Sequence, residues 1–283
     1  MNAQKDHEKR FSFEFFPPKT DVGVEKLKKV REEFTKVNPH FFSVTYGAGG
    51  STRDRTYETV LGTQKETGIE TAPHLSCVGD TKEQLRDLIN DYKEQGIKRI
   101  VTLRGDLPSG MGASLGELKY ASDLVKFIRD ETGDHFHLEV AAYPEMHPQA
   151  ANMQADLDAF KVKVDAGASS AITQYFYNID AYKYFIDSCE KMGIDIPIVV
   201  GIMPITNYEN LVRFSATCGA EIPRWIKARL EGYGDDLDSL KKFGEEVVTG
   251  LCEEVLALGA PGLHFYTLNQ LEPSLSIWKN LNL

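Results

Sequence analysis

The chain has 283 residues, of which 42% are hydrophobic and 26% charged, and its formal net charge is −10. This composition is typical of a globular protein, and the acidic balance argues against sequence-independent binding to nucleic acid or to an anionic membrane surface. The cysteines Cys77, Cys189, Cys218 and Cys252 lack the Cys-x-x-Cys spacing of zinc and iron–sulfur sites. Together with a polar N-terminus and no apolar run near roughly 18 residues, they predict a cytoplasmic protein.

The first predicted strand, residues 11–16, is rich in aromatic residues and is ended by Pro17 and Pro18. Glu14 lies inside this apolar run. Because burial penalises the charged form of a carboxyl group, we expect a raised pKa for Glu14, as a general acid that works near neutral pH requires. The alternative is a structural glutamate that pairs with an arginine from another element.

Further strands are predicted from short apolar and β-branched runs, and helices from the periodic residues between them. The strands follow at 41–45, 71–75, 99–103, 138–142, 170–173, 196–202 and 262–266. The helices are expected at about 24–37, 52–67, 82–95, 118–132, 148–166, 181–192, 208–217, 223–230 and 237–258, with a short helix at the end of the chain.

Strands that are continuous apolar runs, without alternation, indicate a parallel sheet buried on both faces. Eight strand–helix units in a chain of this length favour an α/β fold, a single (β/α)8 TIM barrel. Residues 1–283 are then one catalytic domain, with 1–10 as a flexible N-terminal tail. A doubly wound sheet is the alternative, although neither a Gly-x-Gly-x-x-Gly turn nor a Gly-x-x-x-x-Gly-Lys-Ser/Thr loop occurs.

In a barrel of this kind, the active site forms where the strands end. Polar and aromatic residues gather at the predicted strand ends: Glu14, Thr45, Tyr46, His74, Arg104, Asp106, Tyr143, Glu145, His147, Gln174, His264, Tyr266, Thr267 and Asn269. The mixture of acid, amide, imidazole and aromatic groups favours a flat heteroaromatic ligand with hydrogen-bonding edges.

Several of these residues also have a purely structural interpretation. His74 and His264 can be core histidines bonded to the backbone, and Arg104 with Asp106 can be an ion pair across a turn. The aromatic run 175–177 is more often packing than a stacking platform. No histidine pair has a carboxylate at ligand spacing, so we expect no metal site, and no Ser–His–Asp arrangement stands out.

Taken together, these segments resemble the methylenetetrahydrofolate reductase family from about residue 11 to the end of the chain. The most specific segments are FEFFPP at 13–18, SVTYGA at 43–48, APHL at 72–75, LRGD at 103–106, AAYPE at 141–145, HP at 147–148, ITQ at 172–174 and HFYTLN at 264–269. The order of these motifs along the chain, each at a predicted strand end, is what makes the resemblance specific.

The resemblance implies a flavoprotein of one-carbon metabolism and methionine biosynthesis. Such an enzyme passes hydride from NADH or NADPH through FAD, in a ping-pong reaction, to 5,10-methylenetetrahydrofolate and releases 5-methyltetrahydrofolate. Glu14 corresponds to the general acid that protonates the folate and helps to open its five-membered ring to an iminium ion. Asp106 matches an aspartate whose charge stabilises that cation, and Gln174 matches a residue that contacts folate and nicotinamide alternately.

The resemblance also assigns binding residues. Flavin contacts fall to Thr45, His74, Arg104, Gly105, Asp106, Tyr120, Ala121, Tyr143, His147, Ala150, Asp156, Lys163 and Ile172. Folate and nicotinamide contacts fall to Glu14, Asp106, Gln174, Asn210, Phe214 and Gln270. The chain departs from the bacterial pattern at Gln270, where an arginine usually helps to hold the folate tail, and at Ala159 and Val162, where an asparagine and a basic residue usually help to hold FAD.

The resemblance further implies a homo-oligomer. Because the chain ends after the barrel, we expect neither the regulatory C-terminal domain of eukaryotic members nor inhibition by S-adenosylmethionine. Three other interpretations stay open at this point. They are another flavin barrel, such as a proline dehydrogenase-like enzyme that needs no acid at Glu14, a non-catalytic flavin- or folate-binding protein, and a reductase that takes electrons from a partner protein.

Overall fold

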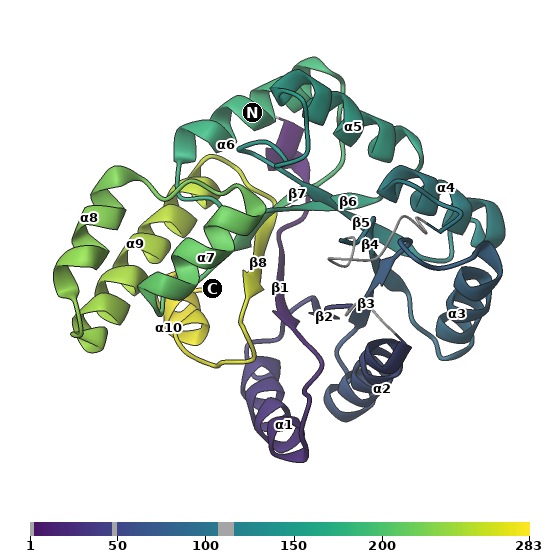
Figure 1. The fold of residues 1–283 in the computed structure, drawn as a ribbon, viewed down its shortest axis with the longest axis horizontal. Coiled ribbons are helices and arrows are strands. Elements are labelled where there is room, and N and C mark those ends of the chain that lie inside the picture. The colour runs from purple at the N-terminus through teal and green to yellow at the C-terminus, as the bar shows by residue number, and fades with distance from the viewer. Residues whose placement is uncertain (1–2, 47–49, 107–115) are drawn as a thin grey trace. The chain divides into compact units, whose positions relative to one another are not determined.

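The computed structural model describes residues 3–46, 50–106 and 116–283 (Figure 1). Eight strands form a closed barrel in chain order, and neighbouring strands pair in parallel. The strands are β1 (Arg10–Phe15), β2 (Phe41–Val44), β3 (Thr71–Ser76), β4 (Arg99–Leu103), β5 (His137–Ala142), β6 (Ser170–Thr173), β7 (Ile198–Ile202) and β8 (Gly262–Tyr266). The predicted (β/α)8 barrel is therefore confirmed, and the doubly wound sheet is excluded.

Helices follow the strands close to the predicted positions. They are η1 (Ala3–Asp6), α1 (Asp21–Thr35), α2 (Gly50–Thr67), α3 (Lys82–Glu94), α4 (Ala121–Thr132), α5 (Met153–Asp165), α6 (Ile179–Lys191), α7 (Tyr208–Cys218), α8 (Arg224–Tyr233), α9 (Leu237–Ala257) and α10 (Ser274–Asn280). Helix α5 begins five residues later than expected, because the Asn152 side chain accepts a hydrogen bond from the N–H of Ala155 and so caps the helix there. In the described part of the chain, no helix has the length and hydropathy needed to cross a membrane.

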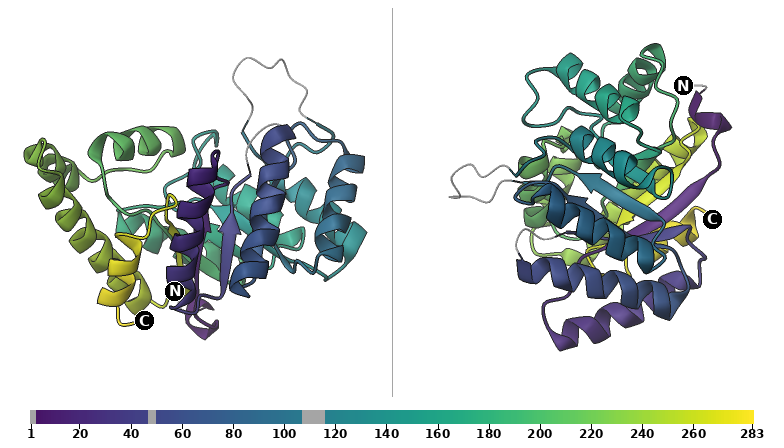
Figure 2. Two further views of the ribbon diagram at one scale, coloured as in Figure 1. Left: turned by 90° about the horizontal axis from the view of Figure 1, so that it is seen from below. Right: turned by 90° about the vertical axis from the view of Figure 1, so that its right-hand side faces the viewer.

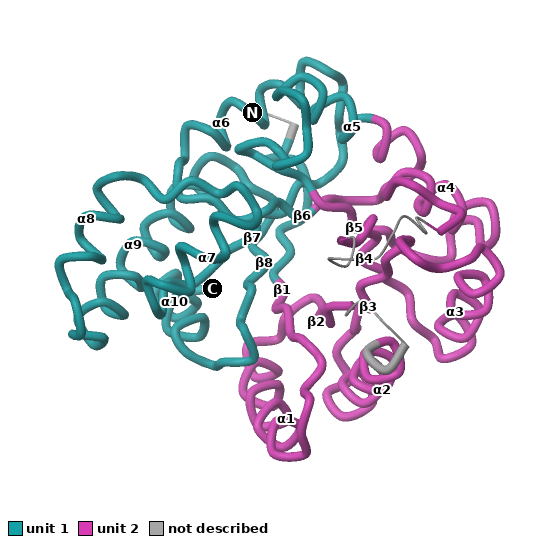
Figure 3. The backbone as a smooth tube through the Cα atoms, viewed as in Figure 1, with its two compact units in different colours: residues 1–11, 142–161, 172–283 teal, residues 12–141, 162–171 magenta. Residues whose placement is uncertain are grey.

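The chain divides into two compact units (Figure 3). One unit comprises residues 12–141 and 162–171, and in it α1 lies beside α2 (Figures 1 and 2). The other comprises residues 1–11, 142–161 and 172–283, and in it α9 lies between α8 and α10.

Aromatic packing buries the first strand, as its sequence predicts. Phe13 is fully buried and stacks on Phe34 of α1, with 4.1 Å between ring centroids. Phe15 contacts both Phe34 and Phe42 of β2. Full burial of one such side chain contributes on the order of 2 kcal/mol, so these rings fix α1 against β1 and β2.

The N-terminal segment is anchored where the sequence predicts a flexible tail. Gln4 is 3% exposed, its side-chain amide donates to the carbonyl of Ile196, and its amide oxygen accepts from the N–H of Ile198 in β7. The two bonds satisfy backbone groups at the start of β7. No local pattern signals this contact, because the partners lie more than 190 residues away in sequence.

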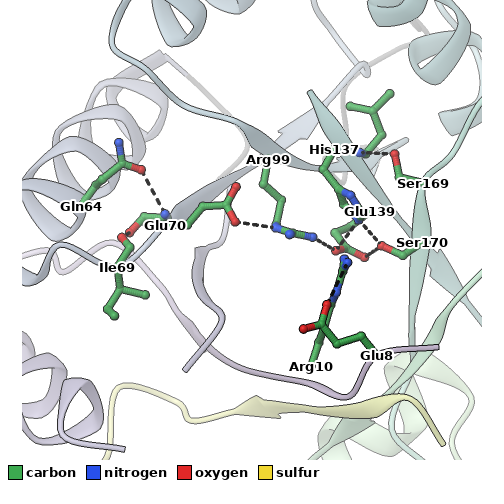
Figure 4. Close-up of polar contacts among 12 residues, drawn as sticks. Glu8, Arg10, Gln64, Ile69, Glu70, Arg99, His137, Glu139, Ser169 and Ser170 are labelled. Atoms are coloured by element: carbon green, nitrogen blue, oxygen red, sulfur yellow. Dashed lines mark hydrogen bonds and ion pairs between the residues drawn. The ribbon is translucent and has the colours of Figure 1, made fainter. Parts of the chain in front are cut away.

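A buried ion cluster occupies the amino ends of β4, β5 and β6 (Figure 4). The Arg99 guanidinium pairs with Glu139 at 2.5 Å and with Glu70 at 3.2 Å, and Glu139 also accepts from Ser170. Burial alone would raise the pKa of Glu139, but the hydrogen bond from His137 and the charge of Arg99 outweigh burial and lower this pKa to about 2. Residues at this end of a barrel serve stability, and the cluster fits that role.

We expect Glu139→Gln to lower the free energy of unfolding by about 3–5 kcal/mol at neutral pH, because it leaves the Arg99 charge buried with a weaker partner. The pKa of Glu139 is depressed in the folded state, so its stabilisation is present above its ordinary value of 4.5 and is lost as pH falls towards about 2. Urea denaturation at several pH values should therefore show the difference between wild type and variant shrinking below about pH 4.

The matched control is Asp130→Asn, which removes the acid of the exposed Lys126–Asp130 pair on α4. Exposed pairs of this kind add little, so this variant should unfold like the wild type. A loss at Asp130 equal to that at Glu139 would contradict the assignment of stability to the buried cluster.

Candidate functional site

An acid, a hydroxyl and an imidazole meet on the three strands β1, β2 and β3. The parallel register places Glu14 beside Ser43 and Ser43 beside Ala72, and His74 lies two residues beyond Ala72 on the same face of β3. The His74 Nε2 atom is 3.2 Å from Glu14 Oε2 and 3.3 Å from Ser43 Oγ. Glu14 thus has a neighbour that can share or relay its proton.

The side chains of Glu14 and His74 are both largely buried. The side chains of His74 and Glu14 are 10% and 17% exposed, so the carboxyl group is sheltered yet reachable. The predicted position of Glu14, near the carboxyl end of a buried strand, is confirmed. One partner of Glu14 is the imidazole of His74.

The end of β4 shows a close backbone approach. Gly105 has φ +89°, a conformation that side chains rarely adopt, and a β-carbon there would collide with Ser76 Oγ. The Ser76 hydroxyl donates to the carbonyl of Arg104, and the Arg104 Nε donates to the carbonyl of Gly105. Asp106 follows as an exposed residue. The turn therefore holds a half-buried guanidinium and an exposed carboxylate next to each other in sequence.

The residues after β2 form a second polar group. Thr45 is half-buried, and its carbonyl accepts from Thr56 of α2. The Tyr46 hydroxyl donates to Asp80 at 3.3 Å, and Asp80 also pairs with Arg53 at 3.6 Å. Burial, followed by the charge of Asp80, raises the pKa of Tyr46 to about 12, so this phenol stays protonated and acts as a donor. The remainder of the SVTYGA motif lies outside the described residues.

Three further predicted flavin contacts belong to the same unit. Tyr120 is 63% exposed and precedes Ala121, the first residue of α4, and the Asp123 carboxylate accepts from the backbone N–H of Tyr120. Lys163 of α5 is half-buried, and its ammonium donates to the carbonyl of Ala141 near the end of β5. Lys163 therefore differs from the solvated lysine that its helix position suggests.

The loop after β5 is organised by His147 and Asp156, both predicted flavin contacts. The Asp156 carboxylate accepts from the N–H of His147 at 2.9 Å, and the His147 carbonyl accepts from the N–H of Ala150. The ring of Tyr143 lies edge-on to that of His147, with 4.6 Å between centroids. Met146, between these two residues, has φ +84°. The structure thus brings together the four predicted contacts of this loop.

Strand β6 ends beside the same loop. Ile172 is buried within β6, and the N–H of Gln174 donates to the carbonyl of Ala142 at 2.7 Å. Gln174 and Tyr143 line one small cavity, together with Glu145 and Tyr175. These side chains are therefore neighbours within their unit.

The carboxyl group of Glu145, in the same loop, has a strongly shifted pKa. Its Oε2 accepts from the backbone N–H of Glu221 at 2.8 Å, while Oε1 is buried without a hydrogen-bond partner among the described residues. Burial raises the pKa of Glu145 to about 7; the Glu221 N–H opposes this rise and the Glu221 carboxylate adds to it. Near neutral pH, Glu145 therefore exchanges between its neutral and charged forms.

The remaining predicted folate contacts lie on or near the surface. Asn210 is exposed in the first turn of α7 and accepts from Arg213, whose guanidinium also lies over the half-buried ring of Phe214 at 5.3 Å. Gln270 is exposed after β8 and follows Asn269, which has φ +57°.

Burial differs among the residues that also have a structural interpretation. His264 is fully buried in β8, and residues 175–177 are all buried, with Tyr175 bonded to Ser215. His74 contacts an acid instead of backbone. Within residues 3–46, 50–106 and 116–283, no group of three or more His, Cys, Asp or Glu could hold a metal ion.

Ser43 and Asp80 contact predicted site residues, and neither was itself predicted as one. Ser43 bonds His74, and Asp80 orders Tyr46 and Arg53. A polar residue in the otherwise apolar strand β2 was the signal available for Ser43. Asp80 has no such signal, because its partners come from a separate loop and helix.

Solved structures of low sequence identity share the fold. An uncharacterized protein from Clostridium thermocellum, described as binding two copies of 5-methyl-5,6,7,8-tetrahydrofolic acid, has a TM-score of 0.66 and 20% identity and covers 99% of this chain and 97% of that chain. An oxaloacetate acetylhydrolase has a TM-score of 0.52 and 10% identity and covers 95% of this chain and 79% of its own. At these identities the likeness supports the barrel alone.

Sequence comparison is more specific. The family model "Methylenetetrahydrofolate reductase" matches residues 1–282. The 5,10-methylenetetrahydrofolate reductases of Pectobacterium carotovorum subsp. carotovorum and Escherichia coli (strain K12) are each 42% identical over 270 residues, covering 95% of this chain and 89% and 90% of theirs. A probable methylenetetrahydrofolate reductase (NADH) of Oryza sativa subsp. japonica is 40% identical, covering all of this chain and 50% of its own length. The chain belongs to the methylenetetrahydrofolate reductase family.

Proposed function

We propose that residues 1–283 act as a single catalytic domain that reduces 5,10-methylenetetrahydrofolate to 5-methyltetrahydrofolate with FAD as cofactor and NADH or NADPH as electron donor. The observation that carries this proposal is the contact between Glu14 and His74 at the ends of β1 and β3, which supplies a sheltered acid where a barrel enzyme needs one. Family membership supports the reaction, and the name of the rice relative supports NADH. A protein of the same fold binds the expected product.

Each unit offers groups of the kind that bind a flavin dinucleotide. Arg104 and Lys163 are half-buried cations of the kind that a pyrophosphate requires in a protein of net charge −10. Tyr143 and His147 offer aromatic faces and polar edges, which a flat ring system requires. The bound flavin would supply reversible two-electron chemistry between nicotinamide and folate.

Glu14 acts on the folate. Its protonated carboxyl donates a proton to a ring nitrogen of the substrate, so that the five-membered ring opens and the methylene carbon becomes an electrophilic iminium. His74 can return a proton to Glu14, because its Nε2 lies within hydrogen-bonding distance. The Asp106 carboxylate stabilises the cationic iminium and binds the pterin edge, while Gln174 orients folate and nicotinamide in turn.

The same proposal places the protein in one-carbon metabolism and methionine biosynthesis, in the cytoplasm and as a homo-oligomer. Its direct test is the visible spectrum of the purified protein without oxygen. Addition of NADH should bleach the flavin absorbance, and later addition of methylenetetrahydrofolate should restore it. A flavin spectrum that neither NADH nor NADPH bleaches would contradict the proposed electron donor.

We expect Glu14→Gln to leave bleaching of the flavin by NADH within about twofold of wild type and to lower the rate of folate reduction by at least roughly 100-fold, because an amide cannot donate the required proton. Stopped-flow absorbance measures the two half-reactions separately. Equal losses in both half-reactions would instead make Glu14 a structural residue.

Glu131→Gln is the matched control for that variant, since it also converts a glutamate to its amide. Glu131 lies in α4 and pairs with Arg86 on the surface. Both half-reactions should proceed at wild-type rates in this variant.

Asp106→Asn should lower the rate of folate reduction by roughly 10- to 100-fold while FAD remains bound, because the neutral amide no longer stabilises the iminium cation. Folate reduction and the flavin content after gel filtration give the two readouts. Loss of FAD as the main effect would show that Asp106 serves cofactor binding instead.

A further inference from the structure

Glu145 connects two segments that the proposed function assigns to different ligands. It lies between Tyr143 and His147, in the loop after β5 that we assign to the flavin, and its carboxylate accepts from the N–H of Glu221. Glu221 lies in the segment after α7, the helix of Asn210 and Phe214, which we assign to the folate. One side chain thus joins the flavin loop to the end of the folate helix.

The same two segments are closely packed beside this bond. Gly219 ends α7 with φ +76°, and a β-carbon there would lie 3.1 Å from Cγ of Pro148 and 3.6 Å from the carbonyl oxygen of Met146. Met146 itself holds φ +84°, which costs of order 1 kcal/mol for a residue with a side chain. A strained loop of this kind persists only where surrounding contacts fix it, and the Glu145 bond is such a contact.

The Oε1 atom of Glu145 faces a small cavity beside the loop after β5. Oε1 is buried, without a hydrogen-bond partner among the described residues, and Glu145 lines the cavity that Gln174, Tyr143, Tyr175 and Cys218 also line. The cavity has room for about one water molecule. A neutral carboxyl can donate to such a water through Oε1 while Oε2 accepts from the backbone.

We propose that Glu145 is a positioning residue for the reductase reaction: its neutral carboxyl holds the loop after β5 against the segment after α7, and so sets the folate helix relative to Gln174 and the flavin loop. The proposal rests on the proposed function for the identity of the ligands. The hydrogen bond to Glu221 and the packing at Gly219 support the latch itself.

Charge on Glu145 should weaken this latch. The groups that face the carboxyl are Glu221, Tyr175 and Cys218, and the first of these repels a second negative charge. Because the pKa of Glu145 is raised in the closed structure, the latch is favoured below its ordinary value of 4.5 and is progressively lost as pH rises towards about 7. Opening of the segment should therefore be roughly tenfold more frequent at about pH 8 than at about pH 6.

The test compares Glu145→Gln, which keeps the acceptor and replaces the acid hydroxyl with an amide donor, with Glu145→Ala, which removes both. Hydrogen–deuterium exchange of residues 219–222 is measured at about pH 6 and pH 8, with the variants compared at the same pH because intrinsic exchange also changes. We expect the Ala variant to exchange on the order of tenfold faster at pH 6. Wild type should already exchange faster than the Gln variant at pH 6, because the latch weakens above pH 4.5, and its excess over that variant should grow roughly tenfold by pH 8.

Steady-state kinetics of the holoenzyme provide the functional readout. Glu145→Ala should raise the KM for methylenetetrahydrofolate roughly tenfold over wild type at about pH 6, and by less at about pH 8, where the wild-type latch is already weakened. Glu145→Gln should give the same KM at both pH values, and Glu221→Gln should make the wild-type rise in KM smaller, because removal of the repelling charge brings the pKa of Glu145 closer to its ordinary value. A merely structural glutamate would lower the melting temperature without producing these pH patterns.

Different results would contradict the latch, the positioning role and the proposed function. The latch would be overturned if residues 219–222 exchanged at the same rate in wild type and Glu145→Ala. It would also be overturned if Glu145→Gln exchanged as fast as Glu145→Ala at every pH. Exchange as expected together with an unchanged folate KM would overturn the positioning role. A wild-type protein that shows the exchange pattern but reduces no folate would overturn the proposed function, and the positioning role with it, while the latch would remain.

Discussion

The parallel register of β1, β2 and β3 is the constraint on which the proposed chemistry depends. Side chains alternate between the two faces of a strand, so a slip of one residue would turn an entire set to the opposite face. In the observed register, Glu14 lies beside Ser43, and His74 reaches both. The burial of Phe13 and Phe15 against α1 fixes this register, and packing of apolar rings thereby determines where the acid is placed.

In strands β4, β5 and β6, residues that stabilise the fold lie at the amino ends, and residues proposed to contact ligands lie at or after the carboxyl ends. Their amino ends hold the buried cluster of Arg99 and Glu139, whose charges compensate each other. At the carboxyl end of β4, the Arg104 guanidinium donates to the carbonyl of its own neighbour. A hydrogen bond of this kind can be exchanged for a ligand contact at little cost.

The sequence predicts the elements well, because their signals are local. Continuous apolar runs identify all eight strands, and the helix predicted from residue 82 begins where the structure has α3, which Thr81 and Gln84 cap. The position of Glu14 at a strand end follows from the same reasoning. Its contact with His74 does not, since it depends on the register of separate strands. The sequence also predicts neither the anchoring of Gln4 nor the hydrogen bond between Glu145 and Glu221, because each joins segments that are distant in sequence. The roles of the exposed residues Asn210 and Gln270 depend on a ligand, and stay predictions.

The close approach of Gly105 and Ser76 has an evolutionary consequence. A β-carbon at position 105 would occupy the space of the Ser76 hydroxyl, and φ +89° adds strain for any residue other than glycine. A smaller residue at position 76 would remove the collision but also the hydrogen bond to the carbonyl of Arg104. A substitution at either position alone should therefore give a less stable turn. The two codons should change together or not at all as the family diverges.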